Sequence, residues 1–388
     1  MDKSAKIDPL DRAREIATQM VAAADIIEES RRIPEPLLEQ LHDARLFRML
    51  LPRSLDGDEV APGDYLLTLE ELARHDGSVA WNIFVGNSAA LIAPFLEPET
   101  ARGIFNNPRS VVAWGPPNEQ TALAVPGGYR VSGKWDFASG CRQANWMGVH
   151  CHVVEPDGNL RLNDAGRTTM RTLLFPAEQA TLLDTWNTTG LRGTASDSYT
   201  VSDLFVAEAF SSTREDPALR REKGPLYAFT MQGLYAVGVA GVGLGIARAM
   251  LEAFVDLAGS KTPRGLGRMA DSPTVQADVA RAEATLGAAR AYLLETLAEL
   301  YAEANEFDPI AVPDRARVRL ATAHAIQGAV AVADHVHKAA GINAIFPGSP
   351  FERRFRDMHT LSQQIQARDA HFTAVGQVLL GIPPPIFY

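Results

Sequence analysis

Residues 129–141 read YRVSGKWDFASGC, and their first seven positions alternate between apolar or small residues and polar ones. A period of two is typical of a β-strand with one buried face. The turn PGG at 126–128 precedes this strand, and a second apolar run at 146–154 ends at the turn EPDG at 155–158. The stretch therefore predicts a small antiparallel, barrel-like β domain, which we place at residues 109–210.

The segments on both sides of this domain follow the period of a helix. The clearest apolar stripe comprises Val275, Val279, Ala282, Leu286, Ala289, Leu293, Leu297 and Leu300. Such a stripe is typical of a helix packed in an antiparallel bundle. We expect an α+β protein that is mostly α, with an N-terminal helical domain at 1–108 and a C-terminal four-helix bundle domain at 225–388. Its long helices are expected at 234–258, 275–300, 316–339 and 360–380.

Composition narrows the class of protein. The 388 residues are 46% hydrophobic and carry 37 basic against 47 acidic side chains, a net charge of −10. Without a basic cluster, a nucleic-acid partner is not expected. The longest apolar run, 234–247, is shorter than the ~18 residues of a membrane span, so no membrane is expected. The N-terminus is charged from its second residue, which predicts a cytoplasmic protein with Cys141 and Cys151 reduced.

Three short motifs suggest other chemistry, but none has the residues it needs. Gly128-x4-Gly133-Lys134 is followed by Trp135 where a phosphate loop has Ser or Thr. The glycines of 238–245 follow no strand, which favours close helix packing over dinucleotide binding. His150 and His152 have no third ligand at a recognisable spacing, so no metal site is predicted.

Four segments, in order, carry a resemblance to a known family. They are EELARHDGSVAWN at 70–82, YRVSGKWDFASGC at 129–141, DTWNTTGLRGTASDSYTVSDLFV at 184–206 and FERRFRDMHTLSQQIQAR at 351–368. Together they resemble the acyl-CoA dehydrogenase superfamily, and within it the two-component (group D) monooxygenases that use reduced flavin from a separate reductase. The resemblance covers nearly the whole chain. It implies flavin between the β domain and the bundle, and a homotetramer built through the bundles.

The resemblance also implies which residues bind the cofactor. They are Trp114, Gly115, Phe137, Ala138, Ser139, Arg268, Gly341 and Gln364. Ser139 matches the position whose hydroxyl faces the flavin, although a serine in a turn after a strand is the alternative. Arg268 matches an arginine near the flavin phosphate, or else is a solvated loop residue. Gly341 matches a loop that meets a neighbouring subunit's cofactor, or else ends a helix.

The last of the four segments separates two reactions. An acyl-CoA dehydrogenase needs a carboxylate base over the flavin, and residues 359–366, HTLSQQIQ, contain no acid. The monooxygenases instead add O2 to FMNH2 or FADH2, form a C4a-hydroperoxide and shield it from water. Arg356-Asp357-Met358-His359 resembles their Arg-Asp-x-His motif, which makes His359 and Ser139 the catalytic candidates. A structural histidine near a helix start is the alternative. Relatives often have a second histidine where Gln363-Gln364 stands.

The expected substrate wall is rich in aromatic residues. It consists of Trp81, Asn82, Asn87, Tyr227, Met231 and Tyr235, which could equally be interdomain core. We expect a monooxygenase that hydroxylates, or oxygenates at nitrogen or sulfur, a small aromatic or heterocyclic molecule. An FAD-dependent acyl-CoA dehydrogenase or oxidase and a non-catalytic scaffold subunit are the alternatives. No NAD(P)H-binding pattern occurs, which fits a separate NAD(P)H-flavin reductase.

Overall fold

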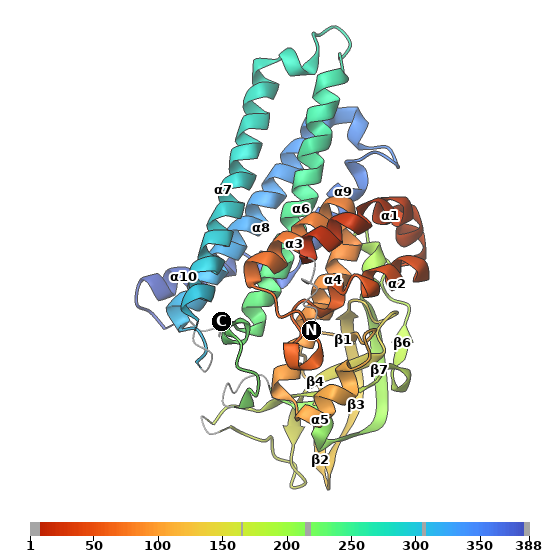
Figure 1. Ribbon diagram of the computed structural model, residues 1–388, viewed down its shortest axis with the longest axis vertical. Coiled ribbons are helices and arrows are strands. Elements are labelled where there is room, and N and C mark those ends of the chain that lie inside the picture. Colours follow the sequence, from red (N-terminus) through yellow and green to blue (C-terminus); the bar gives the residue numbers. More distant parts are fainter. Residues whose placement is uncertain (1–7, 164–165, 214–218, 305–307, 384–388) are drawn as a thin grey trace, which may run out of the picture.

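The computed structural model describes residues 8–163, 166–213, 219–304 and 308–383, in which helices are followed by a sheet and then by more helices (Figure 1). The first helices are α1 (Pro9–Ser30), α2 (Glu35–Asp43), α3 (Pro62–His75), α4 (Gly77–Ala90) and α5 (Pro98–Phe105). Asp76 caps α4, because its carboxylate accepts a hydrogen bond of 2.8 Å from the Val79 amide. The expected order of helical, β and helical parts is confirmed.

The sheet forms the base of the molecule in Figure 1. Its strands are β1 (Val112–Trp114), β2 (Thr121–Val125), β3 (Gly128–Ala138), β4 (Trp146–Val154), β5 (Met170–Pro176), β6 (Thr181–Leu183), β7 (Asp197–Ala207) and β8 (Ser211–Ser212). The order is β6-β7-β3-β2-β4-β5-β8, with β1 beside β4. The prediction of an antiparallel domain was wrong for two pairs, because β4 runs parallel to both β1 and β2. After β3 the chain reverses direction through residues 139–145. Strand β4 therefore runs in the same direction as β2 and pairs with its free edge.

A bulge near the end of β3 shapes the part of the sheet that meets the helices. The register with β7 shifts between Trp135 and Ala138, and Phe137 has a left-handed backbone with φ of 63°. A bulge turns one side chain out of the ladder. Ala138 faces the sheet core with no exposed surface, whereas the Phe137 side chain is 62% exposed.

The upper half of Figure 1 is a helical bundle. It contains α6 (Met231–Ser260), α7 (Pro273–Glu303) and α8 (Val312–Ala340), and the predicted stripe on α7 is buried from Ala282 to Leu300. The expected fourth long helix at 360–380 is instead two short ones, α9 (Glu352–Leu361) and α10 (Ala370–Leu379). Gln364 causes part of this break. Its backbone is extended, and its side-chain oxygen accepts a hydrogen bond of 2.6 Å from the Gln366 amide, which competes with a helical hydrogen bond.

Helices α4 and α6 lie in the core. The segment from the start of α4 to Phe95 and the whole of α6 are each long and apolar enough to cross a membrane. However, 89% of the most apolar stretch of each is buried inside the described protein. Gly238 on α6 allows the close approach of Phe84 on α4, since a Cβ atom there would lie 2.3 Å from the Phe84 ring. Most of the apolar surface of both helices is therefore used in packing.

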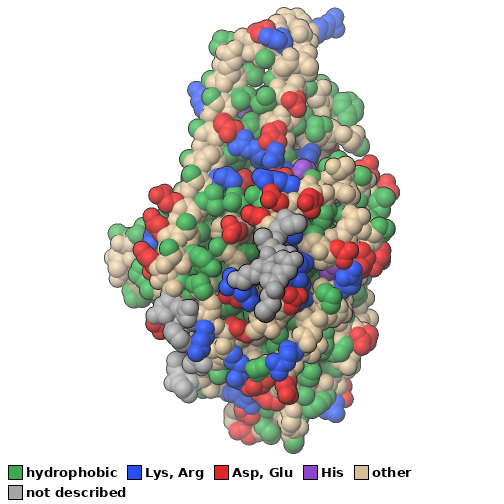
Figure 2. Space-filling view, viewed as in Figure 1, with side chains coloured by type: hydrophobic (Ala, Val, Ile, Leu, Met, Phe, Trp, Pro, Cys, Tyr) green, Lys and Arg blue, Asp and Glu red, His purple; other side chains and the backbone are tan. Residues whose placement is uncertain are grey.

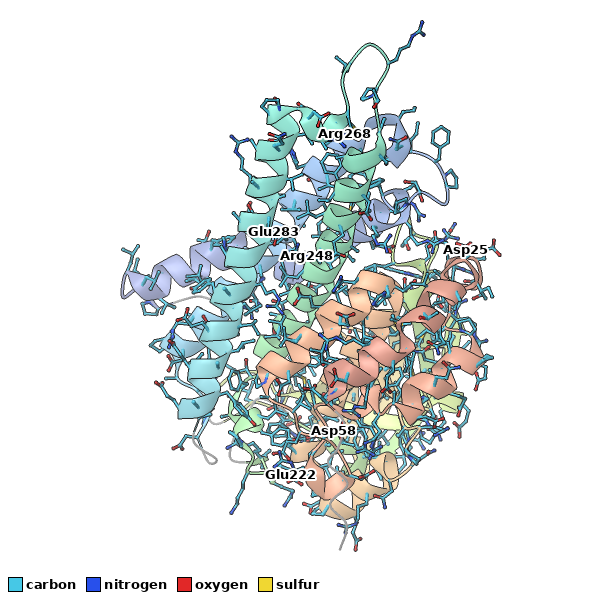
Figure 3. The ribbon with its side chains drawn as sticks, turned by 45° about the horizontal axis from the view of Figure 1, so that its top comes forward. Asp25, Asp58, Glu222, Arg248, Arg268 and Glu283 are labelled. Carbon is cyan, nitrogen blue, oxygen red and sulfur yellow. The ribbon has the colours of Figure 1, made fainter. Side chains whose placement is uncertain are left out.

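Ion pairs join helix α3 to the bundle and also join two helices within the bundle. Arg290 on α7 contacts Glu70 on α3 at 2.7 Å, and Arg248 on α6 contacts Glu283 on α7 at 2.6 Å. Figure 2 shows side chains of both signs mixed across this face, and Figure 3 shows Arg248 and Glu283 adjacent between their helices. Cys141 and Cys151 are both buried free thiols.

Candidate active site

Three hydroxyl groups form a connected chain beside the end of β3. The Oγ atoms of Ser139 and Ser196 are 2.6 Å apart, and Ser196 Oγ lies 2.7 Å from Thr194 Oγ1. Trp81 on α4 donates its indole N–H to Ser139 Oγ at 3.1 Å. Ser196 and Thr194 are buried, whereas Ser139 is half-buried. The hydroxyl chain, Ser139-Ser196-Thr194, therefore connects the protein interior to a surface that a bound molecule can reach.

A row of aromatic side chains leads from Ser139 toward the bundle. The ring of Trp81 meets Phe84 edge-on with centroids 4.9 Å apart, and Phe84 meets Tyr235 on α6 edge-on at 4.7 Å. The side chain of Gln364 acts on the Tyr235 hydroxyl and lowers its pKa, although burial has the larger effect and raises it. The aromatic row, Trp81-Phe84-Tyr235, thus has a hydroxyl at one end and an amide at the other.

The predicted cofactor residues on the sheet lie close together. A Cβ atom on Gly115 would lie 2.2 Å from the carbonyl oxygen of Asp136, so only glycine lets the end of β1 approach this bulge. Phe137 follows directly, and its exposed ring faces Trp186 edge-on at 6.4 Å. Trp114 lies against His150 with centroids 5.0 Å apart and is half-buried. An exposed aromatic ring beside a half-buried hydroxyl supplies the two kinds of contact that a flavin ring needs.

Two orphaned polar atoms lie next to this group. Asn82 Oδ1 and Gln143 Nε2 are buried and have no hydrogen-bond partner among the described residues. They lie 3.1 Å and 3.7 Å from the position that a Cβ atom on Gly140 would take. Native proteins rarely leave buried polar atoms unpaired. An acceptor and a donor beside Ser139 match the N–H and carbonyl groups on the edge of a flavin, so these residues fit that cofactor.

His359 lies away from this arrangement. It belongs to the last turn of α9, so the alternative that placed it near a helix start was wrong. Its Nε2 lies 2.8 Å from Asp334 Oδ1 on α8, and its side chain is 40% exposed. Its ring packs edge-on against Phe355 at 4.2 Å. The structure therefore joins His359 to the surface of the bundle and leaves Gln364 next to the aromatic row.

Two residues of the expected substrate wall are used elsewhere. Asn87 is fully buried, accepting from the Leu50 amide at 3.0 Å and donating to two backbone carbonyls. The Tyr227 hydroxyl donates to the Leu50 carbonyl at 3.3 Å. Their place in the substrate wall stays a prediction, although their polar groups already have partners within the protein. Met231 begins α6 and packs against the main core.

Two predicted cofactor residues lie in loops at the ends of bundle helices. Arg268 is at the end of the bundle opposite the sheet (Figure 3), where it pairs with Asp271 at 2.6 Å. Gly341 ends α8 with φ of 60°, which favours glycine, and exposed Ile342, Ile345 and Phe346 follow it. Within one chain, Arg268 is therefore remote from Ser139.

Sequence reasoning missed three residues of the site. Phe84 lies three positions after Trp81 on the same helix, and this spacing could have indicated it. Thr194 and Ser196 flank Ala195 in a hydroxyl-rich segment, TASDS, at 194–198. Ser196 bonds Ser139 directly and Thr194 does so only through Ser196, so the chain joins residues far apart in the sequence. Spacing does not reveal such contacts.

Comparison with known proteins identifies the family. Residues 8–100 match the N-terminal domain of acyl-CoA dehydrogenase, and residues 237–369 match the C-terminal domain. Indole-3-acetate monooxygenase of Pseudomonas putida is 30% identical over 365 residues, which are 92% of this chain and 90% of the relative. The chain belongs to the acyl-CoA dehydrogenase superfamily, in its group of flavin-dependent monooxygenases. The family resemblance of the four segments is confirmed.

Other members of this superfamily agree in length and fold. The FADH(2)-dependent resorcinol hydroxylase, oxygenase component, of Rhizobium sp. is 29% identical over 96% of this chain and 94% of its own. Among solved structures, XiaF from Streptomyces sp. in complex with FADH2 and glycerol has a TM-score of 0.90 at 22% identity, covering 98% of this chain and 97% of its own. The acyl-CoA dehydrogenase-like fold therefore extends over the described chain.

The different positions of His359 and Gln364 predict different effects of substitution. His359→Ala removes an exposed ion pair, which is worth about 0–1 kcal/mol, so the yield of oxygenated product should stay within about twofold. Gln364→Leu removes the partner of Tyr235 beside the aromatic row, and the yield should fall about tenfold for the loss of ~1.4 kcal/mol. Both variants are compared by product formed per O2 consumed. A larger loss with His359→Ala than with Gln364→Leu would reverse this assignment.

Proposed function

We propose that this chain is the oxygenase component of a two-component flavin-dependent monooxygenase acting on a small aromatic or heterocyclic molecule. The observation that carries the proposal is the aromatic row, which runs from the half-buried Ser139 hydroxyl to Gln364. A wall of this composition favours a flat, apolar substrate. The names of related enzymes, which refer to indole-3-acetate and resorcinol, support the same substrate class.

Each residue has a defined role in this proposal. Reduced flavin, when bound, supplies the electrons that activate O2. Phe137 would pack on the flavin ring. Ser139 would accept a hydrogen bond from an N–H group on the edge of the reduced flavin, in addition to the one from Trp81, because its own proton is donated to Ser196. The Ser139-Ser196-Thr194 chain holds that hydroxyl in place. Phe84, which has no exposed surface, fixes the positions of Trp81 and Tyr235, and these two residues would exclude water and orient the substrate ring.

Gln364 narrows the range of substrates. An amide can donate or accept a hydrogen bond, but it cannot remove a proton at neutral pH. Among the described residues, no carboxylate forms a hydrogen bond with Trp81, Tyr235 or Gln364. The site therefore favours substrates whose reacting nitrogen, sulfur or ring carbon is electron-rich without deprotonation. The same lack of an acid argues against the acyl-CoA dehydrogenase alternative, which needs a carboxylate base.

Partners and assembly complete the proposal. The designation of the Rhizobium relative as an oxygenase component supports a separate NAD(P)H-flavin reductase that supplies FMNH2 or FADH2. The remote Arg268 and the exposed apolar residues after Gly341 support a homotetramer in which bundle ends reach a neighbouring subunit's flavin. We place this assembly in the cytoplasm, where a reductase and NAD(P)H are available.

Rapid mixing tests the proposed reaction. The protein is loaded anaerobically with FMNH2 or FADH2 and mixed with ¹⁸O2 in the presence of indole-3-acetate, resorcinol or indole. We expect one ¹⁸O atom per product molecule for at least one substrate. If a wider panel of aromatic substrates also yields only hydrogen peroxide and no oxygenated product, the proposal is contradicted. Bleaching of bound oxidised flavin by an acyl-CoA without O2 would favour the dehydrogenase, and failure to bind flavin in either redox state would favour a scaffold.

A further inference from the structure

We propose that Asp357 is a positioning residue that holds the segment 190–196, here called the hydroxyl loop, so that Thr194 and Ser196 keep Ser139 in its working orientation. The catalytic consequence of this inference rests on the proposed function, whereas the structural linkage does not. Asp357 lies on α9 and the hydroxyl loop lies between β6 and β7, so the contact joins the bundle to the sheet.

The link from Asp357 to Ser139 is continuous. Asp357 Oδ1 accepts a hydrogen bond of 2.5 Å from the Leu191 amide, and Asp357 is 4% exposed. The carbonyl of the same residue, Leu191, accepts from Thr194 Oγ1 at 2.8 Å. Thr194 Oγ1 in turn bonds Ser196, and Ser196 bonds Ser139. Every step is a hydrogen bond, and most of the chain is buried.

The backbone of the hydroxyl loop needs such a support. Leu191 and Ala195 have φ of 47° and 42°, in the left-handed region that costs a residue with a side chain roughly 1–2 kcal/mol. This conformation persists only where the surroundings fix it. Asp357 supplies the carboxylate oxygen that fixes Leu191, and Trp186 supports the same residue by donating its indole N–H to the Leu191 carbonyl at 3.0 Å.

The contact between Asp357 and Leu191 does not depend on the charge of Asp357. Burial, together with the nearby carboxylates of Asp76 and Glu28, raises the pKa of Asp357 to about 7, although the hydrogen bond from the Leu191 amide and the charge of Arg356 lower it. The charge of Asp357 in turn raises the pKa of Arg354 on the same helix, against the larger effect of burial, which lowers it. A protonated or an ionised carboxyl group keeps an oxygen that can accept from the amide. Asparagine at this position should therefore preserve the contact.

Hydrogen exchange tests the linkage without any cofactor. In the flavin-free protein, amide exchange over residues 187–197 is measured by mass spectrometry for wild type, Asp357→Ala, Asp357→Asn and Glu70→Ala. Loss of a hydrogen bond to a charged group corresponds to about 10- to 100-fold faster exchange in Asp357→Ala. Asp357→Asn should stay within about threefold of wild type, because its side-chain oxygen can still accept. Glu70→Ala is the matched control, since it breaks the pair with Arg290 and leaves the hydroxyl loop untouched.

The reaction gives a second readout. In Asp357→Ala, the fraction of O2 recovered in product should fall about as far as in Ser196→Ala, and combining both changes should cost no more than either alone. If Asp357→Ala does not fold, Asp357→Ser replaces it, because the serine hydroxyl is too short to reach Leu191. Unchanged exchange in the loop, or additive losses in the double variant, would overturn the inference. A wild type that oxygenates nothing while Asp357→Ala loosens the loop would reject the proposed function and keep the linkage.

Discussion

Ser139→Ala is expected to divert O2 from product to hydrogen peroxide. The substitution removes the hydroxyl that lies between Trp81 and the buried Ser196, 3.1 Å from the Trp81 indole nitrogen and 2.6 Å from Ser196 Oγ. A hydrogen bond to a group that develops charge is worth about 1.5–3 kcal/mol, so product formed per O2 should fall about 10- to 100-fold. The measurement is the ratio of product to hydrogen peroxide after mixing the reduced, loaded protein with O2.

Two further serine variants separate the role of the hydroxyl from general damage. Ser139→Thr keeps a hydroxyl at the same place and should retain most of the product yield. Ser132 lies on the same strand, and its hydroxyl accepts a hydrogen bond of 2.8 Å from the Asp203 amide on the exposed face. The product yield of Ser132→Ala should therefore not change. If Ser139→Ala performs like Ser132→Ala, Ser139 has no part in the reaction.

Gly190→Ala is expected to cause the largest loss of stability. A Cβ atom at this position would lie 2.1 Å from the Arg356 carbonyl oxygen and 2.5 Å from the Asp357 amide nitrogen. Both atoms belong to the backbone of α9, so neither can turn aside as a side chain would. The hydroxyl loop would have to leave α9, at a cost of about 3 kcal/mol, the upper part of the usual range for overpacking. Thermal and denaturant unfolding measure this loss.

A second glycine supplies the control for that loss. Gly287 lies within α7, and a Cβ atom there would meet nothing within 4 Å. Gly287→Ala should therefore stabilise the helix by about 0.5–1 kcal/mol through reduced backbone freedom in the unfolded chain. Equal Tm values for the two variants would mean that the hydroxyl loop is not pressed against α9.

Local features of the sequence predicted most of the fold. The stripe from Ala282 to Leu300 and the turn at 126–128 depend on neighbours within a few residues, and both are confirmed. The parallel pairing of β4 with β2 depends on strands separated by a crossover, which periodicity does not reveal. The break at 362–369 arises from side-chain hydrogen bonds of Gln364 and Gln327, and these compete with a pattern that is otherwise helical.

The candidate site was only partly predictable for the same reason. Ser139, Trp81 and Tyr235 could be chosen because motif and residue type indicated them, and their roles stay a prediction. The bond between Ser139 and Ser196 connects two turns that meet only after the sheet has formed. His359 and Gln364 are five residues apart, and only the end of α9 between them decides which one lies beside Tyr235.

The distribution of the site along the chain also affects its timing during synthesis. Trp81 and Ser139 leave the ribosome early, whereas Asp357 and Gln364 follow only after the long helices of the bundle. A nascent chain can fold its early parts first, but it cannot complete the Leu191 and Tyr235 contacts until these late residues emerge. A partly made chain would therefore lack the enclosed surroundings in which reduced flavin and O2 react productively. Maturation of the enzyme is thus tied to translation of its last helices.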